Sequence, residues 1–249
     1  MPDLTEDALY RDTALAQFYD LANQWWIDFD YCTSLASNAA SVLDLGCGTG
    51  ELAVALAKNR RVTAVDPAAA MLGIARNRPG GDKVTWVEAD ARTLRLDERF
   101  DLVLLTGHVF QVFLTQEDQE AALATIAAHL NPNGRFIFDS RNPRLRTWEG
   151  RNRHNSLHRL EHPQFGTIEA WNEPVYDEAT DILTYENGYR ILATGQAFSA
   201  SARIRYTPQE ELAALLEASG LVVDTWLGSW EGDPYHPEAK EIIPIGRLV

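Results

Sequence analysis

The chain has 249 residues, with 36 acidic against 22 basic side chains and a formal net charge of −14. Its hydrophobic fraction of 45% and charged fraction of 23% are typical of an ordinary globular protein and exclude a disordered or fibrous chain. The net negative charge argues against a protein that neutralises many nucleic-acid phosphates, so no extended nucleic acid is expected as a partner. The length allows one large domain, or one domain with an insertion.

Cysteine usage and hydropathy bear on where the protein works. Cys32 and Cys47 are too few for a disulfide framework and lack the spacing of a zinc site. The first twelve residues are acidic and contain no apolar run of the kind found in signal peptides. No apolar stretch reaches the roughly 18 residues that a membrane span requires. We therefore expect a soluble, cytoplasmic protein without a membrane partner.

The first half of the chain has the pattern of alternating strands and helices. Residues 5–31 are expected to form one or two helices. Further on, short runs that are apolar on consecutive positions alternate with helical patterns, which predicts a parallel, doubly wound α/β sheet with both faces covered. Asn131-Pro132-Asn133-Gly134 is expected to end the last of these helices and turn the chain. The expected strands are 42–45, 62–65, 84–87, 102–105 and 136–138, and the expected helices are 51–58, 68–76 and 117–130.

The pattern changes in the second half. Residues 157–206 favour a period of two, which predicts an antiparallel meander. The segment 177–181 is expected to be a hairpin turn, and Asn187-Gly188 either a second turn or a bulge.

The C-terminal residues return to a mixed pattern. Thr207 is expected to cap a helix that has Pro208 at its first position and runs to Ser219-Gly220. Strand-like segments follow at 221–227 and 242–248. We therefore divide the chain into N-terminal helices with a cofactor-binding core (1–140), an inserted antiparallel segment (141–206) and a C-terminal helix with two strands that complete the core (207–249).

The strongest functional signal is a glycine-rich turn between a strand and a helix. Glycines at 46, 48 and 50 allow a tight turn with close backbone approach to a ligand, before a helix opens at Glu51. A dinucleotide fingerprint needs a glycine where Glu51 stands, and a carboxylate there repels a pyrophosphate. Asp44 adds negative charge just before the turn. The expected ligand is therefore positively charged and has no phosphate, and S-adenosylmethionine fits because it carries a sulfonium and an ammonium group.

Acidic residues also follow the next two strands. Asp66 ends the second strand, where an acid can accept hydrogen bonds from both ribose hydroxyls of an adenosine. Asp90 follows the third strand and could hold the adenine amino group, or be no more than a helix cap or a surface turn.

These motifs resemble those of the class I S-adenosylmethionine-dependent methyltransferases that act on small molecules and carry an inserted antiparallel segment. The resemblance covers residues 15–140 well and continues more loosely to the end of the chain. It implies a Rossmann-like seven-stranded sheet whose last strand is antiparallel, with S-adenosylmethionine as cofactor. It also implies the following contacts: Asp44, Gly46, Cys47, Gly48 and Gly50 with the methionine moiety, Asp66 with the ribose, Met71, Asp90 and Ala91 with the adenine, Thr106 and its neighbours with the sulfonium side, and the segment around Tyr19 as a cover.

The residues after the fourth strand bear on the accepting atom. The chain reads Thr106-Gly107-His108 there, without the Asn/Asp-Pro-Pro-aromatic motif of many enzymes that methylate exocyclic amines of bases or glutamine. His108 is the candidate catalytic base for a hydroxyl acceptor, or else a hydrogen-bonded residue that shapes the cofactor pocket. Gln111, the second catalytic candidate, could orient a polar group of the substrate or cap a helix.

Residues beyond the fourth strand suggest further contacts. Asp139, after the fifth strand, could bind an amine or pair with Arg141. The remaining histidines have no spacing typical of metal ligands, so no metal is expected.

The inserted segment suggests the kind of substrate. Its aromatic side chains could wall an aromatic substrate, or form the core of the small sheet. Between residues 135 and 159 lie seven arginines against two acidic residues, which fits either a solvated loop or an anionic small substrate. The segment is expected to cover the active site or to form a homodimer interface. The aromatic residues are Trp148, Trp171, Tyr176, Tyr185 and Tyr189.

The sequence thus predicts a methyltransferase that moves a methyl group to N or O of a small molecule by in-line displacement. One alternative is a non-catalytic protein that binds S-adenosylmethionine as a sensor or as a subunit of a complex. A nicotinamide-dependent oxidoreductase is disfavoured by Glu51.

Overall fold

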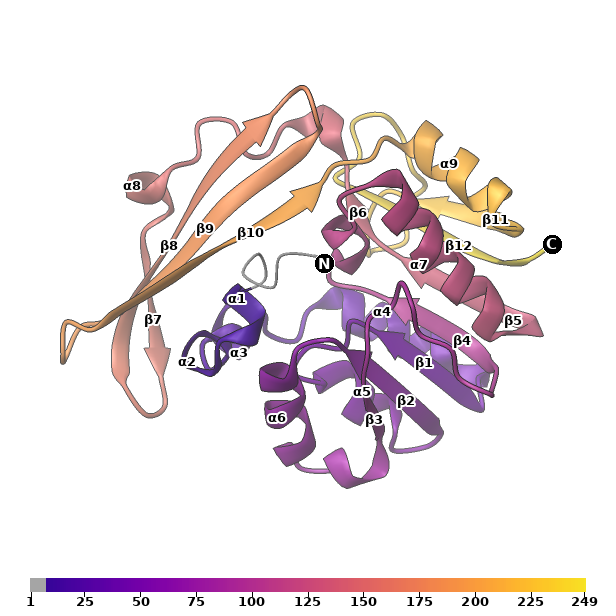
Figure 1. Ribbon diagram of the computed structural model, residues 1–249, viewed down its shortest axis with the longest axis horizontal. Coiled ribbons are helices and arrows are strands. Elements are labelled where there is room, and N and C mark those ends of the chain that lie inside the picture. Colours follow the sequence, from indigo (N-terminus) through magenta and orange to yellow (C-terminus); the bar gives the residue numbers. More distant parts are fainter. Residues whose placement is uncertain (1–7) are drawn as a thin grey trace.

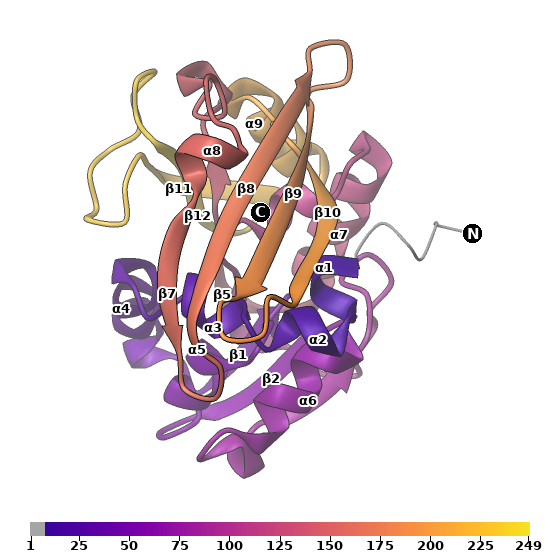
Figure 2. The ribbon, with the colours of Figure 1, turned by 90° about the vertical axis from the view of Figure 1, so that its left-hand side faces the viewer.

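Two sheets dominate the computed structural model, which describes residues 8–249 (Figure 1). The larger sheet is flanked by helices, and the smaller one stands apart from it, with the N-terminal helices between the two (Figure 1). Seen from the side, the smaller sheet lies in front of the larger one like a cover (Figure 2). Among residues 8–249, no helix combines the length and the apolar character needed to cross a membrane.

The larger sheet has the strand order β11-β12-β5-β4-β1-β2-β3. The first five strands of the chain run parallel, whereas β12 is antiparallel to both of its neighbours. This arrangement confirms the predicted Rossmann-like seven-stranded sheet with an antiparallel last strand. The strands are β1 (Ser41–Leu45), β2 (Arg61–Asp66), β3 (Thr85–Glu88), β4 (Phe100–Leu105), β5 (Leu130–Phe138), β11 (Leu221–Leu227) and β12 (Glu241–Leu248), and the short β6 (Ser140–Arg141) also pairs with β12.

Helices cover both faces of this sheet because its strands are apolar on consecutive positions. In β4, Leu104 packs into the cluster that contains α4 and α5, and the next residue, Leu105, packs into the cluster that contains α7 and α9. Successive side chains of a strand point to opposite faces, so each face needs its own apolar cover. The helices are α4 (Ile27–Leu35), α5 (Glu51–Leu56), α6 (Ala69–Asn77), α7 (Gln116–His129) and α9 (Gln209–Ala218).

The predicted turn at 131–134 lies inside the bounds of β5 instead. Leu130 pairs with Phe100, and the register then shifts so that Leu102 pairs with Arg135. The four residues between form an irregularity in the strand, held in part by the Asn131 side chain, which donates a hydrogen bond to Asp101 at 2.7 Å. The helix before them does end, at His129.

The smaller sheet is antiparallel with the order β10-β9-β8-β7, which confirms the inserted antiparallel segment. The chain turns between β8 and β9 at residues 178–181, as expected for a hairpin. The interpretation of Asn187-Gly188 as a turn or bulge is wrong, because both residues lie within β9 and pair without interruption on both sides. The strands are β7 (His158–His162), β8 (Gly166–Asp177), β9 (Ile182–Ile191) and β10 (Ala197–Arg205), preceded by the short helix α8 (Arg153–Ser156).

A close side-chain contact explains the glycine at position 188. The Trp171 ring lies directly over Gly188 on the neighbouring strand, and a Cβ added there would be 2.0 Å from the ring carbon Cζ2. Glycine at position 188 therefore makes room for the Trp171 ring within the strand, and the chain does not change direction there.

The predicted cap of α9 is also wrong. The helix begins at Gln209, and Pro208 occupies the cap position without a side-chain hydrogen bond. The buried Thr207 hydroxyl instead accepts a hydrogen bond from the Gln119 side chain of α7 at 2.8 Å. This bond ties the two helices on one face of the sheet to each other.

The N-terminal residues are more broken than expected. The predicted one or two helices over 5–31 are four helices: α1 (Ala8–Arg11), α2 (Thr13–Ala16), α3 (Tyr19–Ala22) and α4. Residues 5–7 of the expected helical stretch lie outside the described residues. Phe18 is fully buried and stacks on Tyr189 of β9 with ring centroids 4.6 Å apart, so the short helices are anchored to the smaller sheet.

Replacing Gly188 with alanine should lower the free energy of unfolding by about 1–3 kcal/mol, because the new methyl group must displace the Trp171 ring. Urea denaturation measures this change. Gly73→Ala in α6 is the matched control: a Cβ there meets nothing within 4 Å, and alanine favours a helix by up to about 1 kcal/mol. Equal stability of wild type and Gly188→Ala would contradict the packing role.

Candidate functional site

A cavity of about 620 Å³ lies where the core sheet, the N-terminal helices and the smaller sheet meet. Gly46 and Asp66 line it from the ends of β1 and β2, Tyr19 from α3, and Trp171 and Tyr185 from the smaller sheet. The carboxyl ends of parallel strands, beside the point where the strand order reverses, are where open α/β sheets bind ligands. The cavity therefore has the position expected of a ligand site.

The glycine turn after β1 forms part of its wall. Gly46, Gly48 and Gly50 all adopt positive φ values, of 75°, 53° and 77°, which side chains other than glycine rarely tolerate. A Cβ at Gly46 would lie 2.5 Å from Val109, and one at Gly50 would lie 2.4 Å from the Trp86 ring. Gly46 and Gly48 line the cavity, whereas Gly50 serves the close packing behind it.

Asp66 connects this turn to the end of β2. Its Oδ2 accepts a hydrogen bond from the Gly48 amide at 2.9 Å, and its Oδ1 accepts one from the Ala68 amide at 2.8 Å. The side chain is buried but lines the cavity. It therefore fixes the turn and presents negative charge to a ligand.

Asp44 lies behind the turn, and not on the cavity wall. It is 3% exposed, and burial, together with the charge of Asp66, raises its pKa to about 7. A positively charged ligand on the other side of the turn would favour its ionised form.

Of the other residues predicted to contact the cofactor, some line the cavity and some do not. Met71 is buried and lines the cavity, as expected for a residue that packs on a ligand. Asp90 forms an ion pair of 2.6 Å with Arg92. Burial alone would raise the pKa of Asp90, but the hydrogen bonds that it accepts from Arg92 outweigh burial and lower that pKa. The wall includes neither Asp90 nor Ala91, Thr106 or Cys47, so their predicted ligand contacts stay predictions.

Hydrogen bonds among Asp20, Thr49 and Arg78, called the Asp20 latch below, hold α3 against the glycine turn. The Thr49 hydroxyl donates to Asp20 Oδ1 at 2.6 Å, and Arg78 donates to the Thr49 carbonyl at 2.6 Å and to Asp20 Oδ2 at 2.5 Å. The latch places Tyr19 beside Gly48 at the cavity. No motif in the sequence marks Arg78 as part of the site.

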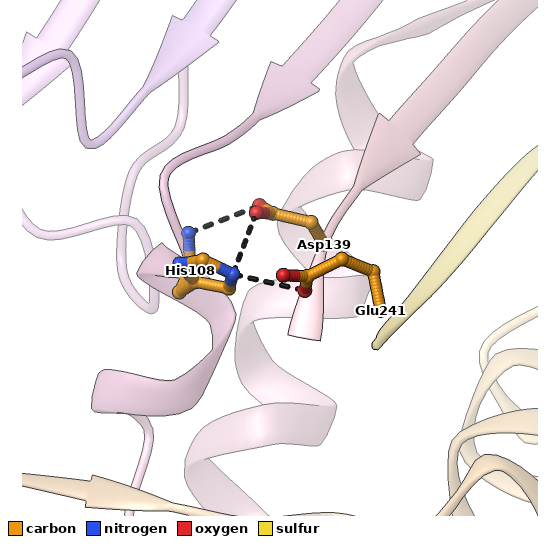
Figure 3. A group of neighbouring side chains, drawn as sticks. All are labelled: His108, Asp139 and Glu241. Atoms are coloured by element: carbon orange, nitrogen blue, oxygen red, sulfur yellow. Dashed lines mark hydrogen bonds and ion pairs between the residues drawn. The ribbon is translucent and has the colours of Figure 1, made fainter. Parts of the chain in front are cut away.

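His108 lies at the carboxyl end of β4 and lines the cavity. Its backbone is left-handed, with φ of 62°, and its amide donates to Asp139 Oδ1 at 3.0 Å. Its Nε2 is 2.9 Å from Glu241 Oε2 and 3.3 Å from Asp139 Oδ2 (Figure 3). Glu241 begins β12, which lies beside β5 in the sheet, and no sequence signal connects it with a residue 133 positions away.

Burial shifts the protonation of all three groups. It lowers the pKa of His108 to about 4, raises that of Glu241 to about 7, and raises that of Asp139 as well. The imidazole is therefore neutral at physiological pH, beside two carboxylates that are poorly stabilised by solvent. Such a group of one nitrogen and two oxygen ligands can hold a proton or a metal ion.

Gln111, predicted as a second catalytic candidate, does not line the cavity. It is fully buried, donates to the Arg205 carbonyl at 3.2 Å and accepts from the Arg141 side chain at 3.0 Å. It therefore acts on the cavity only through Arg141, which does line it.

The inserted segment contributes charge and aromatic surface to the same cavity. Of the seven arginines between residues 135 and 159, Arg141 and Arg151 line it. Four of the five aromatic residues that were expected there do so, and Tyr176 instead stacks on Trp148 with ring centroids 4.2 Å apart. Tyr10, which the sequence did not indicate, also lines the cavity and is hydrogen-bonded to Tyr185 at 2.8 Å.

Comparison with known proteins agrees with this geometry. Residues 42–134, which contain the glycine turn, Asp66 and His108, match a family model described as a methyltransferase domain. The cypemycin N-terminal methyltransferase of a Streptomyces species is 26% identical over 97% of this chain and 98% of its own length. The malonyl-[acyl-carrier protein] O-methyltransferase of Bacillus cytotoxicus is 34% identical, but over 41% of this chain and 35% of its own.

A solved structure shares the fold. The CcbJ methyltransferase of Streptomyces caelestis superimposes with a TM-score of 0.78 at 21% identity, and the match covers 94% of this chain and 97% of that one. The fold, the matched domain and the glycine turn with its acidic partners therefore agree. Residues 42–134 therefore match a methyltransferase domain, and the whole chain is similar in sequence to one methyltransferase and in fold to another.

Proposed function

We propose that this protein transfers the methyl group of S-adenosylmethionine to a nitrogen or oxygen atom of a small molecule. The observation that carries the proposal is that the glycine turn, Asp66 and His108 line one cavity with the smaller sheet. Its volume of about 620 Å³ suits small ligands better than a macromolecule. The relatives named above, one an N-terminal methyltransferase and one an O-methyltransferase, support either acceptor.

The cofactor is proposed to occupy the part of the cavity between the glycine turn and Met71. Asp66 would accept hydrogen bonds from the ribose hydroxyls, since its carboxylate already faces the cavity. Gly46 and Gly48 would receive the methionine moiety, with Asp44 behind them as a buried negative charge. Tyr19 would cover the cofactor, because the Asp20 latch holds it beside Gly48.

His108 is proposed to activate the acceptor. An amine needs only to arrive neutral, whereas a hydroxyl must lose a proton before or during methyl transfer. His108 lines the cavity after the end of β4, at the carboxyl edge of the core sheet. The smaller sheet, which is proposed to contact the substrate, lines the same cavity. The neutral imidazole of His108, held in place by Asp139 and Glu241, is the group placed to assist that loss.

The substrate is proposed to carry an anionic group and an aromatic or otherwise planar part. Arg141 and Arg151 line the cavity, and neither forms an ion pair within 4.0 Å among residues 8–249, although Arg141 lies opposite Glu241 in the β6–β12 pair. Guanidinium groups bind carboxylates and phosphates through paired hydrogen bonds. The rings of Trp148 and Tyr206, 4.5 Å apart, form the adjoining wall. A homodimer through the smaller sheet and a cytoplasmic location stay predictions.

Asp66→Asn should weaken S-adenosylmethionine binding by about 1–3 kcal/mol, because the charge-assisted hydrogen bonds to the ribose are lost. Isothermal titration calorimetry measures the affinity, and circular dichroism checks that the turn still folds. Asp177→Asn, at the exposed end of β8, is the control and should bind as the wild type does. Wild-type affinity in Asp66→Asn would overturn the proposed cofactor position.

S-adenosylmethionine affinity should fall as the pH is lowered from about 7.5 to about 6. The pKa of Asp44 is about 7, so this carboxyl becomes protonated over that range and no longer attracts the cationic cofactor. The effect is at most about tenfold per pH unit for a single group. Calorimetry across this range should show a shallower profile for Asp44→Asn, in which Glu241, whose pKa is also about 7, still titrates. The same slope in both proteins would rule out Asp44 as its source.

Arg151→Gln should raise KM for an anionic substrate by about tenfold or more, with little change in kcat, because the arginine contributes binding and not chemistry. The assay follows S-adenosylhomocysteine formation over a panel of aromatic carboxylic acids that bear an amine or a hydroxyl. Arg144→Gln is the matched control, since Arg144 does not line the cavity and its exposed side chain pairs with Glu210 at 3.6 Å. Cofactor binding without turnover on any panel member would favour the non-catalytic sensor.

A further inference from the structure

A cluster of three side chains at the carboxyl edge of the core sheet has the composition of a metal site. His108 follows β4, Asp139 follows β5 directly, and Glu241 begins β12, and these three strands are neighbours in the sheet (Figure 3). Each offers one ligand atom, and these three atoms lie within 4.8 Å of one another. Three separate strands therefore bring one nitrogen and two oxygen donors to a single point.

The distances between the donors match those of a coordination sphere. Nε2 of His108 lies 2.9 Å from Glu241 Oε2 and 3.3 Å from Asp139 Oδ2. Ligand atoms that are about 2.0–2.2 Å from a metal lie roughly 3.0–3.4 Å apart at octahedral and tetrahedral angles. Two of the three donor–donor distances are therefore those of a coordination sphere, and the third pair lies within 4.8 Å.

The two oxygens of Asp139 are used differently. Oδ1 accepts a hydrogen bond from the His108 amide at 3.0 Å, which fixes the carboxylate. Oδ2 is directed at the cluster and receives no hydrogen bond from the described part of the chain, although Asp139 is only 1% exposed. A buried carboxylate oxygen without a donor costs free energy, and a cation in the cluster would remove that cost.

The charges of the surroundings also call for a cation. Two carboxylates face one imidazole. The basic residues nearest to them are Lys240, next to Glu241 in the chain, and Arg141, which pairs with Glu241 across β6 and β12 and whose side chain is hydrogen-bonded to Gln111 at 3.0 Å. Among residues 8–249, no arginine or lysine forms an ion pair with Asp139 or Glu241. Buried charges are stable only when they are paired or coordinate a metal.

We propose that His108, Asp139 and Glu241 bind one divalent cation at the edge of the substrate cavity. One imidazole nitrogen with two carboxylate oxygens suits manganese, iron or zinc, and three protein ligands leave coordination positions open. The sequence predicted no metal, because Glu241 has no spacing that connects it with His108.

This inference deepens the proposed function and rests on it for the role of the cation. His108 lines the cavity, so an open position of the cation faces the space where the acceptor binds. A bound cation lowers the pKa of a coordinated hydroxyl, which then loses its proton to solvent. The resulting oxygen attacks the methyl carbon, and the bond from that carbon to the sulfonium sulfur breaks. His108 then activates the acceptor as a ligand of the cation, in place of acting as a base itself.

The test is a manganese titration of the full chain after treatment with a chelator. Electron paramagnetic resonance of free Mn²⁺ should show one ion bound per chain, and Glu241→Gln should weaken binding at least about tenfold, since one charged ligand is lost. Glu238→Gln is the matched control: its side chain is 83% exposed and three residues away, and it should bind as the wild type does. His108→Gln should weaken binding as well, and circular dichroism checks the folding of each variant.

Two results would overturn the metal site: no stoichiometric Mn²⁺ binding by the folded wild type, or equal binding by wild type, Glu241→Gln and His108→Gln. Calorimetry with S-adenosylmethionine, run on the same samples, separates this outcome from a failure of the proposed function. Cofactor binding without Mn²⁺ binding overturns only the metal site. Mn²⁺ binding without cofactor binding leaves the metal site and overturns the methyl-transfer role.

Discussion

The carboxylate of Asp66 accepts hydrogen bonds from the backbone amides of Gly48 and Ala68, and so ties the turn after β1 to the chain after β2. That turn is left-handed at three glycines and passes so close to its neighbours that a Cβ at Gly46 would overlap Val109. Val109 in turn follows His108 directly. The conformation of one glycine turn therefore sets the position of both the proposed cofactor side and the proposed acceptor side of the cavity.

The cavity lies among groups of opposite charge. Asp66 lines it, and Asp44 and the pair of Asp139 and Glu241 lie behind its wall at the carboxyl edge of the sheet. Arg151 lines it among aromatic rings, and so does Arg141, which pairs with Glu241 across β6 and β12. A cationic cofactor and a proposed divalent cation suit the acidic groups, and an anionic substrate suits the arginines. The net charge of −14 conceals the two arginines that line the cavity.

Much of the fold could be predicted because it depends on local patterns. Consecutive apolar residues in β1, β2 and β4 indicated strands buried on both faces, and the period of two indicated the smaller sheet. The errors arose where a distant side chain decided the local structure. Trp171 makes Gly188 a packing position within β9, and Gln119 takes the Thr207 hydroxyl that was expected to cap α9. Neither partner is near in sequence, so no local pattern could have revealed it.

The sequence by itself determined the glycine turn, the acids at the ends of β1 and β2, and His108 at the end of β4, because a parallel sheet brings the ends of its strands to one edge. Only the tertiary structure decided what those residues meet. It brought Glu241 from the antiparallel last strand to His108, placed Arg141 and Arg151 in the cavity among seven candidate arginines, and turned Asp90 and Gln111 away from it. The physical reason is that strand order and the path of the inserted segment are set by packing of the whole chain, which residue spacing does not encode.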